Sequence, residues 1–306
     1  MLTGLAQEVV IEMAIQRVGV VGFGQMGSGI AQICAQAGLD TLVREVDQSL
    51  VDKGFQRVDG SLARLVKSGR TTEEDAKAAR GRLRGTTSLA EFKDRDLIIE
   101  AIVEQIEPKK KLFAELDTVC PPATIFCSNT SSLTIVEMAA ATRRPEKFAG
   151  LHFFNPPVIM KLVEIVKAIT TSDETVAALR DFVAKIGKTG VVCKDTTGFI
   201  VNRLMVPYLL GAIRMLELGV ATKEDIDNAV KLGLGYPMGP FELIDYTGVD
   251  INYHVSNVFF DEFKEAYMAP PPLLRRMFLA GQLGTKTGKG FYDYDEQGKK
   301  KSQQTE

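Results

Sequence analysis

Short apolar runs and amphipathic stretches alternate along the amino-terminal part of the chain. The β-branched run at residues 17–21 predicts a buried strand. Apolar residues between 30 and 37 recur at helical spacing and predict a helix that ends at Gly38. A second apolar run at 41–43 follows at once. Strand, helix and strand within about thirty residues predict a βαβ unit with a right-handed crossover.

The same alternation continues to about residue 192. Further strands are predicted at 96–104, 124–127, 150–154 and 161–166, and helices at 48–82, from Pro108 onward and after a cap at 128–132. The run at 96–104 is almost continuously apolar, which is typical of a central parallel strand covered on both faces. The pattern therefore predicts an α/β domain with a doubly wound sheet.

The pattern changes beyond Gly198. Apolar residues from 199 to 218 form one long helix face, and shorter helical pieces follow without a second βαβ series. With 306 residues, the chain is also longer than one apolar core usually supports. We therefore expect a sheet domain at residues 1–194 and an all-helical domain at 195–306, whose apolar surface suits a subunit interface.

The composition is that of an ordinary globular enzyme, 45% hydrophobic and 25% charged. Its 37 basic and 39 acidic residues leave a formal net charge of −2. No basic field therefore favours nucleic acid or an anionic membrane as a partner. No apolar run approaches the roughly 20 residues that cross a bilayer, so the chain is not expected to enter a membrane.

Two further features concern the compartment in which the chain works. Residues 1–16 carry Glu8 and Glu12 but no Lys or Arg, which is the wrong charge for a targeting segment and favours the cytoplasm. The four cysteines form no CxxC pair; they are Cys34, Cys120, Cys127 and Cys193. Because they lie in apolar surroundings, we expect buried thiols rather than disulfides, and no metal site.

A glycine-rich sequence joins the first strand to the first helix. It consists of Gly22, Phe23, Gly24, Gln25, Met26 and Gly27, and it matches GxGxxG. In this position Gly22 permits the tight turn, Gly24 lets backbone amides approach a pyrophosphate, and Gly27 lets the helix lie close to the strand. The pyrophosphate would lie at the positive end of the helix. These six residues are therefore the predicted cofactor-binding loop.

A nicotinamide dinucleotide also needs a carboxylate for the adenosine ribose, near the end of the second strand. Glu45 fills that position, and Asp47 is the second candidate. An anion there repels the additional phosphate of NADP, so NAD is the expected cofactor. The neighbouring Arg44 weakens this inference, unless it is a solvated surface residue.

His152 lies in an apolar strand directly before the turn Asn155-Pro156-Pro157, and Glu164 lies in the next extended run. If these runs form a hairpin, the carboxylate reaches the imidazole, fixes its tautomer and stabilises the imidazolium. A dehydrogenase needs this because the hydroxyl of its substrate loses a proton as the carbon loses hydride. A packed core histidine is the alternative interpretation. His254, the other histidine, is interpreted as structural.

Two further polar sites are candidates for contact with the substrate. Residues 128–132, Ser-Asn-Thr-Ser-Ser, follow a predicted strand at its carboxyl end, where ligands collect in open α/β sheets. The same residues suit a helix cap, and the sequence favours neither interpretation. Asn202 lies in the strongly apolar stretch 198–204 and needs a hydrogen-bond partner there. A substrate oxygen would satisfy it.

Taken together, these motifs resemble those of the L-3-hydroxyacyl-CoA dehydrogenases, the NAD-dependent enzymes of β-oxidation and of 3-hydroxybutyryl-CoA metabolism. The resemblance extends from Arg17 to about Tyr294. Its signatures are 22–27 (GFGQMG), 100–104 (EAIVE), 128–132 (SNTSS), 150–156 (GLHFFNP), 198–203 (GFIVNR) and 286–292 (KTGKGFY). One departure concerns Glu45, because this family usually has the shorter Asp there.

The resemblance implies a Rossmann-like domain followed by a helical domain that forms a homodimer, and an acyl-CoA thioester as substrate. It implies that His152 is the catalytic acid–base and Glu164 its partner. Ser131, Asn155 and Asn202 are expected around the reacting oxygen and the thioester. Glu104, Lys109, Ser131, Asn155 and Lys286 are expected to line the NAD site, and Ser61 and Lys67 to contact CoA. A solvated helix face is the alternative for Ser61 and Lys67.

The predicted reaction is reversible oxidation of a short-chain (S)-3-hydroxyacyl-CoA to the 3-ketoacyl-CoA, in which His152 takes the hydroxyl proton while hydride passes to NAD⁺. One alternative is an NAD-dependent dehydrogenase of a free sugar acid such as gulonate. Another is a non-catalytic, crystallin-like NAD-binding protein. The joint presence of His152, Glu164, Ser131 and Asn202 argues against this last alternative, because a structural protein does not need them.

Overall fold

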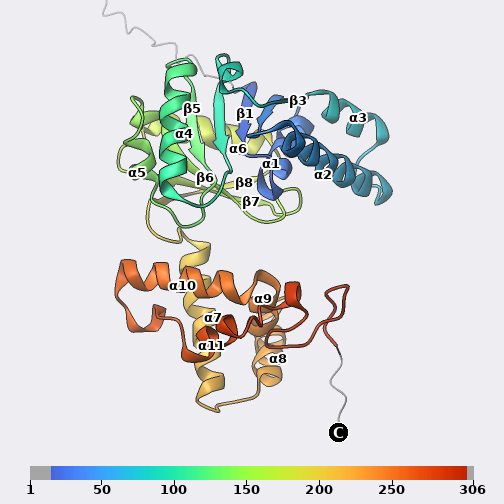
Figure 1. Cartoon of the computed structure of the whole chain (residues 1–306), viewed down its shortest axis with the longest axis vertical. Helices are drawn as coiled ribbons and strands as arrows, with labels where there is room; N and C mark the ends of the chain where they lie inside the picture. The colour runs from blue at the N-terminus through green and yellow to red at the C-terminus, as the bar shows by residue number, and fades with distance from the viewer. Residues whose placement is uncertain (1–14, 302–306) are drawn as a thin grey trace, which may run out of the picture. The chain divides into compact units, whose positions relative to one another are not determined.

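The computed structural model describes residues 15–301 (Figure 1). The chain divides into two compact units between Thr196 and Thr197, two residues beyond the boundary that the sequence predicts. The first unit is an α/β sheet unit and the second is helical, as predicted.

The sheet unit is built on one sheet of eight strands, in the order β3-β2-β1-β4-β5-β6-β7-β8. The strands are β1 (Arg17–Val21), β2 (Asp40–Arg44), β3 (Leu83–Thr86), β4 (Leu97–Glu100), β5 (Ile125–Ser128), β6 (Phe148–Phe153), β7 (Leu162–Lys167) and β8 (Thr189–Lys194). Neighbouring strands are parallel except β6 and β7, which form an antiparallel hairpin. The strand order reverses between β1 and β4, which is where doubly wound sheets bind ligands.

Helices connect and cover these strands. They are α1 (Gln25–Gln36), α2 (Gln48–Lys67), α3 (Glu73–Gly81), α4 (Ile106–Val119), α5 (Ile135–Ala139) and α6 (Asp173–Lys185). The helix α1 packs against β1 and β2, and α6 packs against β7 and β8. The apolar faces that the sequence pattern predicts fill the core between them; its members include Val18, Val20, Ile30, Val43, Ile99 and Leu151. Their burial provides most of the driving force for folding.

The predicted helix at 48–82 is wrong in its length. The helix α2 ends at Lys67, Gly69 adopts a positive φ of 68°, and α3 starts after its N-cap Thr72. The strand β3 follows directly, and the sequence pattern missed it. Only the two end residues of this edge strand are buried, so it carries little of the apolar signal that marks a strand.

Two other predicted elements differ in extent. The apolar run at 96–104 is a strand only over β4, because the chain turns into a loop after Glu100. The helix expected to open at Pro108 begins two residues earlier, at Ile106. The interior position of the strand β4, between β1 and β5, is as predicted.

The second unit contains five α-helices in its described part, residues 197–301. They are α7 (Val201–Glu217), α8 (Lys223–Leu234), α9 (Pro240–Thr247), α10 (Val249–Phe263) and α11 (Pro272–Leu279). Their apolar faces enclose a separate core, which includes Leu209, Ile213, Phe241, Ile244 and Phe259. Across residues 15–301, no helix has both the length and the apolar character needed to span a bilayer.

Two buried carboxylates hold the segment after α11 onto this helical core. Asp245 accepts hydrogen bonds from the backbone amides of Phe291 and Tyr292, both at 2.8 Å. The Tyr292 hydroxyl donates to Asp227 at 2.9 Å. Burial raises the pKa of both carboxyls. The motif at 286–292 is thus a segment that binds to α8 and α9 of its own unit.

Three of the four cysteines are buried and Cys193 is half-buried. Burial raises the pKa of the Cys34 and Cys120 thiols to about 12, so both are neutral thiols at physiological pH. Within residues 15–301, no cluster of side chains suited to holding a metal ion is found.

Candidate active site

The glycine loop between β1 and α1 leaves room for a ligand to approach the backbone. A Cβ atom on Gly27 would lie 1.8 Å from the Gly22 carbonyl oxygen, so helix and turn can approach this closely only without a side chain. A Cβ atom on Gly24 would meet nothing within 4 Å. The helix α1 begins after Gly24 with no side-chain cap and no acid in its first turn. Its first amides are therefore suited to a pyrophosphate.

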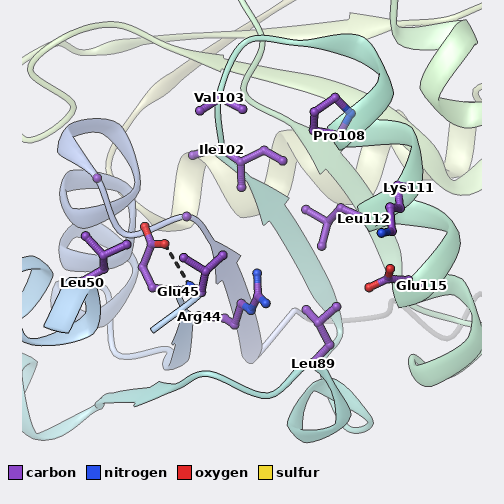
Figure 2. Close-up of a pocket in the computed structure, with 14 residues that line it drawn as sticks. Arg44, Glu45, Leu50, Leu89, Ile102, Val103, Pro108, Lys111, Leu112 and Glu115 are labelled. Atoms are coloured by element: carbon purple, nitrogen blue, oxygen red, sulfur yellow. Dashed lines mark hydrogen bonds between the residues drawn. The ribbon is translucent and has the colours of Figure 1, made fainter. Parts of the chain in front are cut away.

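A pocket of about 640 Å³ opens beside this loop, over the carboxyl ends of β2, β1 and β4. Arg44, Glu45 and Leu50 lie on one side of it, and Lys111 and Glu115 of α4 lie on the other (Figure 2). Its size is in the range of ordinary small-molecule sites. Together with the exposed backbone at the glycine loop, it fits the adenosine half of a dinucleotide.

Glu45 is the carboxylate of this pocket that lies beside the glycine loop. Its Oε1 accepts the Phe23 amide at 2.7 Å, and its Oε2 accepts the Val46 amide at 3.2 Å. Asp47, the second candidate, instead caps α2 by accepting the Leu50 amide at 3.0 Å. The extra methylene of a glutamate lets its carboxylate reach the glycine loop, where it can also accept hydroxyl groups of a ribose.

Arg44 also lines the pocket, but its Nε donates to the Thr87 carbonyl at 3.3 Å. One nitrogen of the guanidinium is thus already hydrogen-bonded within the protein. Because Glu45 places a negative charge next to it, this end of the pocket disfavours a second phosphate.

The predicted His–Glu pair is confirmed by the hairpin of β6 and β7. His152 and Glu164 are directly opposite each other in the antiparallel register. His152 Nδ1 lies 2.7 Å from Glu164 Oε2, and both side chains are buried. A hydrogen on Nδ1 donates to the carboxylate, which leaves Nε2 as the nitrogen that can accept a proton.

The loop after His152 is attached to the glycine-loop helix. Gln25 Nε2 donates to Asn155 Oδ1 at 3.1 Å. A Cβ atom on Gly29 would lie 3.0 Å from the Pro157 ring, so α1 and this loop are in close contact. Lys188 Nζ donates to the Pro157 carbonyl oxygen at 2.7 Å. The histidine is thus held on the same framework as the cofactor-binding loop.

The loop at 128–132 is organised by Glu104. The Ser131 amide donates to Glu104 Oε1 at 2.9 Å, and the Thr130 hydroxyl donates to the same oxygen. Burial opposes ionisation of Glu104, but the Lys109 ammonium and these hydrogen bonds outweigh it and lower the pKa of the carboxyl. Glu104 is therefore an anion at neutral pH.

The helix-cap interpretation of 128–132 is wrong. The helix α5 follows Thr134, and its amides at Ile135 and Val136 donate to the Asp195 carboxylate at 3.0 and 2.8 Å. Because a residue from the end of β8 satisfies these amides, the loop at 128–132 remains at the carboxyl end of β5, as its interpretation as a ligand site requires.

One buried acid beside Lys109 was not singled out by the sequence. Glu100, the last residue of β4, is fully buried and forms an ion pair with Lys109 at 2.6 Å. Lys109 Nζ also lies 3.1 Å from Glu104 Oε2. A glutamate at the end of an almost continuous apolar run is the signal that could have identified it, since buried carboxylates need partners.

The remaining predicted residues lie on other elements, of the sheet unit or of the helical unit. Ser61 and Lys67 lie on α2, where Ser61 is half-buried and Lys67 is exposed. Asn202 lies in the first turn of α7, in the helical unit. Lys286 belongs to the same unit, and its Nζ lies 2.6 Å from the Asp250 carboxylate. His254 is exposed on α10 and contacts the Phe278 ring.

A glycine loop whose free amides suit a phosphate, a carboxylate after the second strand and a buried His–Glu pair at the carboxyl edge of one sheet are typical of a dehydrogenase that uses a dinucleotide. Comparison with known proteins identifies the family within this class. Residues 17–196 match the family model "3-hydroxyacyl-CoA dehydrogenase, NAD binding domain", and residues 198–294 match its "C-terminal domain". The chain therefore belongs to the 3-hydroxyacyl-CoA dehydrogenase family, and NAD is its cofactor.

Individual relatives match the sequence of this chain over nearly their whole length. A 3-hydroxybutyryl-CoA dehydrogenase of Mycobacterium tuberculosis is 50% identical over 92% of this chain and 99% of its own. The mitochondrial hydroxyacyl-coenzyme A dehydrogenase of Rattus norvegicus is 45% identical over 92% of both chains. The solved (S)-3-hydroxybutyryl-CoA dehydrogenase of Ralstonia eutropha has a TM-score of 0.90 at 40% identity, over 92% of this chain and 100% of that one. These likenesses support the thioester reaction over the sugar-acid and non-catalytic alternatives.

Proposed function

We propose that the protein catalyses the reversible oxidation of a short-chain (S)-3-hydroxyacyl-CoA to the 3-ketoacyl-CoA, with NAD⁺ as the oxidant. The observation that carries the proposal is the buried His152–Glu164 pair, whose loop is hydrogen-bonded through Asn155 to the cofactor-binding helix. The activities for which the relatives are named support the choice of a 3-hydroxyacyl thioester as substrate.

In the proposed reaction, the substrate hydroxyl donates its proton to His152 Nε2 while the carbinol carbon becomes a carbonyl carbon. Bound NAD⁺ would supply the acceptor for the hydride that leaves this carbon. Glu164 holds the imidazole through Nδ1 and stabilises the imidazolium that forms. In the reverse direction the imidazolium protonates the developing alkoxide. Positioned proton transfer of this kind contributes about 10²–10⁴-fold to the rate.

The other predicted residues contact the substrate or the cofactor in this proposal. Ser131, Asn155 and Asn202 would contact the reacting oxygen and the thioester. The residues proposed to bind NAD are Gly22, Phe23, Gly24, Gln25, Met26, Gly27, Glu45, Glu104, Lys109, Ser131, Asn155 and Lys286. Ser61 and Lys67 on α2 are proposed to contact the CoA.

The test of this function is the oxidation of NADH in the presence of acetoacetyl-CoA. We expect rapid oxidation with acetoacetyl-CoA and none with free acetoacetate, because the thioester provides the binding energy of CoA. A series of 3-ketoacyl-CoA substrates from C4 to C16 should show the highest kcat/KM at the short end. Turnover of a free sugar acid such as gulonate, without turnover of acetoacetyl-CoA, would overturn the proposal. NADH binding without turnover of any of these would do the same.

We also propose a homodimer formed through the helical unit. Several large apolar side chains of this unit are exposed in the single chain, including Leu204, Leu218, Leu232 and Leu234. Leu232 is 87% and Leu218 79% exposed, which is typical of a surface that another subunit covers. Light scattering should give a mass of twice 33.5 kDa. A concentration-independent mass of one chain would contradict the dimer.

The cytoplasmic location remains part of this proposal. Fractionation of cells that produce the protein would test it, and recovery in a membrane or exported fraction would contradict it.

A further inference from the structure

A fully buried carboxylate at the end of β4 has no part in the proposed chemistry. Glu100 accepts three hydrogen bonds, from Lys109 Nζ at 2.6 Å, from the Ile102 amide at 2.6 Å and from Ser128 Oγ at 2.5 Å. These donors come from α4, from the loop after β4 and from the end of β5. One side chain thus joins three elements at the edge of the sheet where the dinucleotide is expected to bind.

The first of these links decides where the Lys109 ammonium lies. Lys109 is buried, and a buried ammonium is costly unless carboxylates compensate it. Its two partners differ in burial, because the Glu104 side chain is 39% exposed and that of Glu100 is not exposed at all. The shorter of the two ion pairs is also the one with Glu100, at 2.6 Å against 3.1 Å. Glu100 is therefore the principal anchor of the ammonium.

The second link reaches the loop at 129–132. Ser128 Oγ, which donates to Glu100, accepts the Thr130 amide at 3.3 Å. The Thr130 hydroxyl and the Ser131 amide in turn donate to Glu104, which Lys109 also contacts. Two paths of polar contacts thus lead from Glu100, one through Lys109 and one through Ser128, and both end at the Glu104 carboxylate.

We propose that Glu100 is a positioning residue for the cofactor site: it holds Lys109 and the loop at 129–132 in place, and through them it orients Glu104 and Ser131. This rests on the proposed assignment of Lys109, Glu104 and Ser131 to the NAD site. Glu100 itself does not touch the cofactor in this role, because its two oxygens are occupied by protein donors and its side chain is fully buried.

The test is the affinity for NADH, measured by fluorescence titration of the full chain without any acyl substrate. Glu100→Gln keeps the shape of the side chain but removes its charge. We expect its Kd for NADH to rise about tenfold, the effect of losing one good hydrogen bond to a charged group. The KM for NADH should rise with it, while kcat changes by less than about threefold. In the double variant with Lys109→Met, the rise in Kd should be smaller than the two single effects combined, because one of the two paths from Glu100 runs through the ammonium.

Asp117→Asn is the matched control. Asp117 is also buried, lies on α4 like Lys109, and forms ion pairs with Arg143 and Arg144. We expect this variant to lower the melting temperature without changing the Kd for NADH. A variant that loses only stability therefore has a lower melting temperature and an unchanged Kd for NADH, whereas a variant that loses positioning has a raised Kd.

Three results would overturn the proposal: a wild-type Kd in a folded Glu100→Gln protein, effects of Glu100→Gln and Lys109→Met that add in full, or an equal rise of Kd in Asp117→Asn. If Glu100→Gln does not fold, Ser128→Ala removes one donor to the same carboxylate and should raise the Kd about two- to fivefold; an unchanged Kd would then overturn it. Because NADH alone is titrated, failure of acetoacetyl-CoA turnover would count against the proposed function and leave this result intact.

Discussion

Replacing His152 with glutamine is expected to lower kcat by about 10²–10⁴-fold in both directions. The side chain of glutamine retains an acceptor and a donor at nearly the same place, but it takes up no proton at physiological pH. The Kd for NADH should stay within about twofold of wild type, since the glycine loop and Glu45 that are proposed to bind the dinucleotide are unchanged. Stopped-flow measurement of acetoacetyl-CoA turnover gives kcat, and fluorescence titration with NADH gives the Kd.

His254→Gln is the matched control for this substitution, because His254 is exposed on α10 of the helical unit. We expect its kcat to remain at the wild-type value. Turnover of His152→Gln at a similar rate would exclude His152 as the acid–base. Loss of NADH binding in His152→Gln would instead mean that the substitution had disturbed the sheet edge as a whole.

Replacing Glu164 with glutamine is expected to lower kcat and to move the pH profile. The glutamine oxygen can still accept the Nδ1 hydrogen, so the ring stays oriented, but the negative charge 2.7 Å from it is lost. The charge that supports the imidazolium in the proposed reaction is then missing. The pH dependence of kcat should therefore change. Rates of acetoacetyl-CoA reduction and of its reverse, measured across pH 5–10, would show this.

Glu164→Asp distinguishes the effect of the carboxylate charge from the effect of its distance from the His152 ring. It retains the anion but shortens the side chain by one methylene, so we expect a lower kcat with a smaller displacement of the pH profile than in Glu164→Gln. Since Glu164 is buried, melting curves of both variants are needed alongside the kinetics. A Glu164→Gln protein with a wild-type rate and an unchanged profile would rule out the pairing as a catalytic device.

Much of the candidate site was accessible from the sequence because its signals are local. The GxGxxG loop follows a strand and opens a helix within a few residues. For Gly22 and Gly27 the structure displays the steric reason, as with the 1.8 Å approach at Gly27. The hairpin prediction succeeded for a similar reason. A proline-rich turn between two short apolar runs restricts the register, and His152 and Glu164 are opposite each other in it.

The elements that the sequence pattern missed have weak or misleading local signals. The edge strand β3 has exposed residues at its two central positions, and it follows a helix that the pattern extended too far. The run at 96–104 continues as an apolar sequence after the strand has ended, since Ala101, Ile102 and Val103 form a wall of the dinucleotide pocket instead. Hydrophobicity reports burial, and a pocket lining can be as apolar as a strand.

By itself, the sequence determined the class of fold, the two units, the glycine loop, Glu45 and the His–Glu pair, because these follow from periodic burial, turn chemistry and short-range spacing. Only the tertiary structure decided that Glu100 anchors Lys109, that Glu104 organises a loop 27 positions further on, and that Gln25 reaches Asn155 across 130 positions. Such partners belong to different strands and helices. The strand order of the sheet brings them together, and hydrogen bonds act only over about 3 Å, a distance that no periodicity along the chain encodes.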